Sequence, residues 1–232
     1  MKHVSVIQHT QSEWLGQIED HLEGRGIRFG YSRPFTTGGT IPEATVVGDG
    51  LILLGGGPWS ARRTARTLPT LDVEVRLARA CLMLGKPVIG FGLGAQILAL
   101  AAEGGVDEAP LTLTVGEAVR VADGALGGLL PPRFPNVVYM RDRPRPPDYA
   151  SILAVDAEGQ PALFQIGTNA FGFSGHPGVR RAMIEDLVME FEEAPANAAD
   201  GLAQISALGA AIDDALVPIM AGLIAATGWM AS

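Results

Sequence analysis

Short, unbroken apolar runs alternate with amphipathic stretches through the first hundred residues, and this alternation limits the fold more than any other feature. The runs Val4–Ile7, Gly50–Leu54 and Pro87–Phe91 indicate buried strands. Between them, Glu13–Leu22 and Leu71–Leu84 carry apolar residues at helical spacing. Strands that are apolar on both faces and separated by helices predict a parallel sheet covered on both sides.

The pattern changes after this region. Between residues 111 and 175, short runs separated by turns show the two-residue period of antiparallel strands. These runs are Leu111–Val115, Ala118–Val121, Val137–Met140, Ile152–Val155, Pro161–Gln165 and Ala170–Phe173. A helix is expected at Val179–Glu193, followed by two alanine-rich helices, roughly Asp200–Leu208 and Ala211–Ala226. We therefore expect a doubly wound α/β domain over residues 1–193, with an antiparallel annex, and a C-terminal helical extension over residues 194–232.

Charge and cysteine content exclude several classes of function. The chain has 25 acidic and 17 basic residues, which argues against nucleic-acid binding because phosphate needs a positive partner surface. The single cysteine, Cys81, cannot form an intramolecular disulfide or a cysteine metal cluster. The four histidines lack ligand spacing, so we expect no metal and no cofactor.

The two ends of the chain bear on location and assembly. The apolar run near Met1 is too short for a signal peptide core, so we expect a cytoplasmic protein. Residues 215–232 carry no charged side chain, but they contain Pro218 and Gly222 and lack basic flanks, which argues against a membrane span. Because this segment is too apolar to face water, we expect a homodimer or a docked partner there.

Three loops, each expected after a strand, carry a resemblance. They are Gly90–Gln96, Gly55–Pro58 and the pair His176-Pro177. In order and approximate spacing, across residues 1–193, they resemble the nucleophile elbow, the oxyanion loop and the triad histidine of class I glutamine amidotransferases. The resemblance is strongest to stand-alone members similar to the GMP synthetase amidotransferase domain. It implies a flavodoxin-like fold and a site for glutamine.

The departures from the family concern its chemistry. Gly92 stands where the resemblance places the cysteine nucleophile, and Gly178 stands where it places the glutamate that orients the histidine. A thioester mechanism requires a nucleophile, so His176 is a remnant base with no proton to take. The elbow position imposes backbone strain that glycine avoids, so a chain that no longer uses the nucleophile gains from Gly92.

The remaining pocket is predicted from the same resemblance. The amides of Gly56, Gly57 and Leu93 would point into it, and Gln96 and Ser174 would line it. Such a pocket could bind glutamine or another small carboxylate or amide. We therefore expect an amidotransferase-like protein that has lost glutaminase activity and acts as a ligand-binding or partner-subunit protein. Because family enzymes pass ammonia to a synthetase domain, a synthetase-type partner is one possibility.

Two alternatives stay open. One is an active glutamine amidotransferase or another hydrolase that uses His176 with an unrecognised nucleophile. Cys81 is expected to be a buried hydrophobe, whereas Ser174 shares a strand face with His176. The other is a nucleotide-binding protein, because Gly90-x-Gly92-x-x-Ala95 fits a dinucleotide-binding fingerprint. The arginines Arg141, Arg143 and Arg145 are expected to form a solvated turn.

Overall fold

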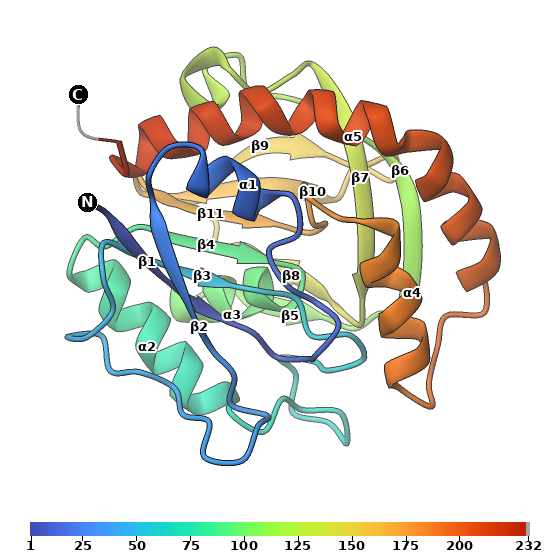
Figure 1. Cartoon of the computed structure of the whole chain (residues 1–232), viewed down its shortest axis with the longest axis horizontal. Helices are drawn as coiled ribbons and strands as arrows, with labels where there is room; N and C mark the ends of the chain where they lie inside the picture. Colours follow the sequence, from blue (N-terminus) through green and yellow to red (C-terminus); the bar gives the residue numbers. More distant parts are fainter. Residues whose placement is uncertain (231–232) are drawn as a thin grey trace.

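The structure, a computed structural model, describes residues 1–230 and is built on one mixed sheet (Figure 1). Its nine strands lie in the order β2-β1-β3-β4-β11-β10-β9-β6-β7. The first five are parallel to one another, and each later pair is antiparallel. In sheet order the strands are β2 (Arg28–Ser32), β1 (His3–Ile7), β3 (Gly50–Leu53), β4 (Val88–Phe91), β11 (Ala170–Phe173), β10 (Pro161–Ile166), β9 (Ser151–Val155), β6 (Thr112–Arg120) and β7 (Arg133–Met140).

Helices cover both faces of the parallel part. On one face, α2 (Leu71–Met83) and α3 (Leu93–Ala101) bury their apolar side chains against β1, β3 and β4. On the other face lie α1 (Ile18–Glu23) and the C-terminal half of α5 (Ala198–Thr227), as Figure 1 shows. The helix α4 (Arg181–Glu190) and the N-terminal half of α5 pack on β6 and β7. The short helix η1 (Ala125–Gly128) and the pair β5 (Gly105–Asp107) and β8 (Arg143–Arg145) complete the fold.

The predicted fold class is therefore confirmed. The central parallel strands β3, β4 and β11 are fully buried, and β4, which leads into the glycine elbow, lies between the other two. The antiparallel annex continues the same sheet, because β11 pairs parallel with β4 and antiparallel with β10. The carboxyl ends of β1, β3, β4 and β11 consequently meet at one edge.

Several predicted boundaries are wrong. The helix expected at Glu13–Leu22 is confined to Ile18–Glu23, because Gly16 adopts a positive φ of 60° and the preceding residues form a loop. The two strands expected at Leu111–Val115 and Ala118–Val121 are the single strand β6, which pairs with β7 without a break. The expected solvated turn also differs: Arg143–Arg145 forms β8, paired with β5.

The two predicted C-terminal helices are one helix, α5, of 30 residues. A single interior glycine such as Gly209 costs a helix only about 1 kcal/mol, which continuous packing offsets. By length and composition α5 is apolar enough to cross a membrane. Its buried side chains, among them Leu216, Ile219 and Leu223, pack on the protein's own core. The protein itself thus covers much of the segment for which a partner was expected, and the homodimer stays a prediction.

This packing predicts that alanine substitutions at buried and exposed positions of α5 lower the free energy of unfolding by different amounts. Leu223 is 1% exposed and Val217 is 53% exposed. Leu223→Ala should lower the free energy of unfolding by about 2–5 kcal/mol, because it leaves a cavity in the core. Val217→Ala should change it by less than about 0.5 kcal/mol. Denaturant unfolding measures both values, and equal losses would contradict the observed orientation of α5.

Candidate functional site at the glycine elbow

Gly92 forms a sharp turn between β4 and α3. Its φ and ψ are 53° and −113°, a conformation that costs a residue with a side chain about 1–3 kcal/mol. The amide of Gly92 donates to the carbonyl of Phe173 at 2.9 Å, and that of Gly94 donates to the carbonyl of Leu54 at 3.1 Å. The ends of β3 and β11 therefore clamp the elbow from both sides.

The space beside Gly92 is open enough for a side chain. A Cβ atom added there would lie 3.5 Å from the Cα of Gly55 and 4.0 Å from the carbonyl oxygen of Ser174, which are ordinary contact distances. The structure thus brings Gly92 and Ser174 together with the predicted loop Gly55–Pro58, at a turn of the shape that the sequence implied. What the turn presents to the pocket is only a hydrogen atom.

The glycine loop after β3 packs tightly beside the elbow. A Cβ on Gly56 would overlap the side chain of Leu93, and Gly57 adopts a positive φ of 55°. A buried histidine holds the loop: His9 Nδ1 lies 3.0 Å from the carbonyl oxygen of Gly55, and its Nε2 lies 2.6 Å from Glu74 Oε2. Interaction with the Glu74 carboxylate raises the pKa of His9, although burial acts in the opposite direction.

A carboxyl group that the sequence analysis did not identify lies against this loop. The side chain of Glu13 is so close to Gly55 that a Cβ there would overlap its carboxylate. Glu13 is 5% exposed and lines one cavity together with Gly92, Ser174 and His176. Burial raises its pKa to about 7, and the nearby amides of Gly57 and Gly55 only partly offset this effect.

Two polar atoms in this cavity lack hydrogen-bond partners among residues 1–230. They are Oε2 of Glu13 and the hydroxyl oxygen of Tyr139, both buried. The cavity has a volume of about 10 Å³, which is close to the room that one water molecule needs. The pocket is therefore largely filled by the protein's own side chains, and a single water could serve both atoms.

His176 is held in the neutral form with both ring nitrogens occupied. Its Nε2 donates to the carbonyl of Trp14 at 2.9 Å, and its Nδ1 accepts from the amide of Gly178 at 3.2 Å. The ring also packs against Phe91, with centroids 5.1 Å apart. Burial lowers the pKa of His176 to about 4. The structure places this residue in the pocket but gives its ring nitrogens backbone partners.

Gly178 is closely packed against the start of α1. A Cβ on Gly178 would lie 2.8 Å from Cγ1 of Ile18 and 3.1 Å from its amide nitrogen. The carbonyl of Gly178 accepts from the amide of Gln17 at 3.0 Å. A glutamate, the residue that the resemblance implies here, would require the start of α1 to move.

Three further residues considered in the sequence analysis are buried or hydrogen-bonded to the protein's own backbone. Gln96 is fully buried, its Oε1 accepts from the amide of Ala61, and its Nε2 donates to the carbonyl of Arg141, so it joins α3 to two loops. Ser174 lines the pocket, but its hydroxyl donates to the carbonyl of Ala162 at 3.4 Å. Cys81 is buried within α2, and burial raises the pKa of its thiol.

The residues that sequence reasoning missed belong mostly to the β1–α1 loop, residues 8–17. This loop supplies His9, Glu13 and the carbonyl of Trp14. A signal was available, because polar residues directly follow the apolar strand β1, and the carboxyl ends of parallel strands are the usual binding edge of such sheets. The partner Glu74 gave no such signal.

Comparisons with known proteins agree with this geometry. Over 178 residues the chain is 31% identical to a glutamine-hydrolysing GMP synthase of Aeropyrum pernix, in a match that covers 73% of this chain and 33% of that protein. A crystal structure of a glutamine amidotransferase from Thermotoga maritima matches with a TM-score of 0.80 at 20% identity, over 97% of this chain and 98% of that one. One from Methylobacillus flagellatus matches with a TM-score of 0.78 at 23% identity, over 97% and 95%. No family model matches the chain.

Fold and sequence agree with one another. The chain has the fold of the two solved glutamine amidotransferases, with its elbow, glycine loop and histidine at one edge of the sheet. Its sequence is similar to part of a GMP synthase. The chain spans about a third of the length of that curated relative.

The buried carboxyl of Glu13 predicts a dependence of stability on pH. A folded-state pKa of about 7, above the ordinary 4.5, means that the folded protein binds more protons between these values. This group's contribution is therefore greatest below pH 4.5 and is lost as the pH rises through 7. Relative to the wild type, Glu13→Gln should gain up to about 3 kcal/mol of unfolding free energy between pH 4.5 and pH 8.

Denaturant unfolding at several pH values measures this difference. The opposite effect of His176, whose lowered pKa favours the folded state as pH rises from 4 to 6.5, is common to both proteins and cancels. The exposed residue Glu43 provides the control, and Glu43→Gln should follow the wild type at each pH. A constant difference between Glu13→Gln and the wild type would show that Glu13 is not buried as described.

Proposed function

We propose that this chain is an amidotransferase-like protein that has lost glutaminase activity and acts as a ligand-binding or partner-subunit protein. The observation that carries the proposal is the hydrogen atom of Gly92 at the apex of the elbow. Glutamine hydrolysis of the family type begins with nucleophilic attack on the side-chain amide, and glycine provides no nucleophile. The cavity lining offers no thiol in its place.

The environment of the elbow supports the same proposal. A base must be free to accept a proton, and both ring nitrogens of His176 have backbone partners. The amides of an oxyanion loop stabilise developing negative charge only when that position is vacant. Here the carboxyl group of Glu13 lies against Gly55, where it competes with any incoming amide.

The proposed partner is of the synthetase type. The relative from Aeropyrum pernix is a GMP synthase about three times as long as the matched region, so the matched region belongs there to a larger synthase. By analogy, this chain would act alongside a synthetase unit, on its own or another chain. A cytoplasmic location, a homodimer and the division at residue 193 are parts of the same proposal.

The two alternatives receive less support. A serine hydrolase would need Ser174 bonded to His176, whereas the hydroxyl donates to Ala162. A phosphate at the elbow would need free amides, but those of Gly92 and Gly94 are already bonded to Phe173 and Leu54. Neither alternative is favoured by a specific contact.

An ammonia assay tests the loss of activity. Incubated with glutamine, the wild-type protein should release no more ammonia than buffer, because the first bond-forming step lacks its nucleophile. His176→Ala should give the same result. A class I amidotransferase with its cysteine serves as the positive control. Ammonia release by the wild type that disappears in His176→Ala would overturn the proposal.

Restoring the nucleophile alone should not restore activity. Gly92→Cys has room for its Cβ but must adopt a positive φ, so it should lose about 1–3 kcal/mol of stability. Gly92→Ala is the matched control and should lose a similar amount. Both variants should remain inactive, because the acid is absent and Glu13 lies against the loop. Glutamine turnover by Gly92→Cys would show that the rest of the site is still competent.

A further inference from the structure

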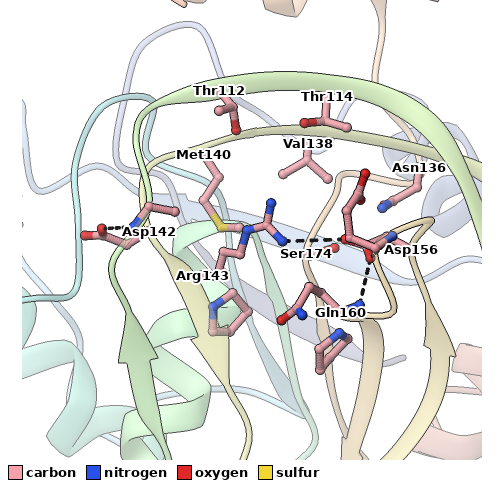
Figure 2. Close-up of a pocket in the computed structure, with 14 residues that line it drawn as sticks. Thr112, Thr114, Asn136, Val138, Met140, Asp142, Arg143, Asp156, Gln160 and Ser174 are labelled. Atoms are coloured by element: carbon pink, nitrogen blue, oxygen red, sulfur yellow. Dashed lines mark hydrogen bonds and ion pairs between the residues drawn. The ribbon is translucent and has the colours of Figure 1, made fainter.

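A second cavity lies on the other face of the antiparallel annex from α4 and α5 (Figure 2). Thr112, Thr114, Asn136, Val138 and Met140 of β6 and β7 form one wall. The residues that close it come from the segment after β7 and from the turn between β9 and β10, together with Ser174. Its volume is about 40 Å³, enough for about three water molecules, and none of its residues except Ser174 lines the elbow pocket.

A buried amide faces this cavity. Asn136 is 7% exposed, and Figure 2 shows its carboxamide directed into the space. Within residues 1–230 the structure shows no hydrogen bond from this carboxamide to another group. Its oxygen lies against Gly175, and its NH₂ group can donate to an occupant of the cavity.

A loose ion pair lines the same cavity. Nη1 of Arg143 lies 3.9 Å from Oδ2 of Asp156, beyond hydrogen-bond distance, so each group can take a further partner (Figure 2). The other oxygen of Asp156 accepts from the amides of Glu158 at 3.0 Å and Gln160 at 2.7 Å, which fixes the carboxylate. Asp142, a buried acid that also lines the cavity, accepts hydrogen bonds from the hydroxyl of Ser60 and from the amide of Ala109.

The polar groups of this cavity, a guanidinium, a carboxamide and a carboxylate, favour one class of ligand. A guanidinium and a carboxamide N–H together suit a carboxylate, and a carboxylate fixed on one side suits an ammonium group. Val138 and Met140 offer apolar contact between these polar groups. The limited volume restricts the occupant to a few heavy atoms inside the cavity.

From this arrangement we propose that the annex cavity binds a small free α-amino acid of the size of glycine or alanine. Arg143 and Asn136 bind its carboxylate, and Oδ2 of Asp156 binds its ammonium group. The site differs from the elbow pocket and does not depend on whether the elbow is active. It gives the protein a means of responding to a small amino acid.

Isothermal titration of the full chain with glycine and with L-alanine tests the proposal. One of them should bind with one-to-one stoichiometry. Acetate and methylamine, which each carry one of the two charges, should bind at least about tenfold more weakly. No binding of either amino acid at about 10 mM, or equal binding of acetate, would overturn the proposal.

Variants locate the site. Arg143→Gln and Asp156→Asn should each weaken binding at least about tenfold, which corresponds to 1.4 kcal/mol. Asp156→Asn keeps the oxygen that accepts from the turn amides, so the fold is retained. Arg133→Gln, at an exposed ion pair on the same strand pair, is the control and should leave binding unchanged. Binding that survives Arg143→Gln but is lost in Glu13→Gln would place the ligand at the elbow and overturn the proposal.

Discussion

The hydrogen bonds that clamp the elbow organise the site edge of this protein. Gly92 and Gly94 donate to carbonyl groups at the ends of β11 and β3, so the turn keeps its shape without help from any catalytic side chain. A strained backbone conformation persists when contacts with the surrounding structure outweigh the energy cost of that conformation. Glycine relieves the strain, and the clamp preserves the geometry.

Several contacts of the β1–α1 loop and α1 enclose His176, Gly178 and the glycine loop. The carbonyl of Trp14 accepts a hydrogen bond from Nε2 of His176, and Ile18 fills the space that a glutamate at position 178 would need. The carboxyl group of Glu13 lies against the glycine loop, and the buried pair of His9 and Glu74 holds that loop in place. The β1–α1 loop thus occupies the space around His176 and the glycine loop.

Much of the fold could be predicted from local pattern. Apolar runs predicted β1, β3 and β4, and two-residue periodicity predicted the annex. One strand expected in the annex, β11, pairs parallel with β4 instead. The errors arose where tertiary contacts outweigh local preference. Gly116 does not interrupt β6, because β7 pairs along its whole length, and Gly209 does not interrupt α5, because the helix packs on the core. At the site, Gly92, Gly178 and His176 were identified from motif order, whereas Glu13 and His9 were missed because no motif contains them.

The amino-acid sequence by itself determined the alternation that yields a doubly wound sheet, and it determined the absence of a nucleophile at the elbow. Only the tertiary structure decided what lies against the glycine loop and that both ring nitrogens of His176 have backbone partners. It also decided that the ion pair of Arg143 and Asp156 lines one cavity together with Asn136. The physical reason is that hydrophobic periodicity reflects residues close together in the chain. The contacts at these sites join residues that are far apart in the sequence. Their burial and charge interactions exist only once the sheet brings the strand ends together.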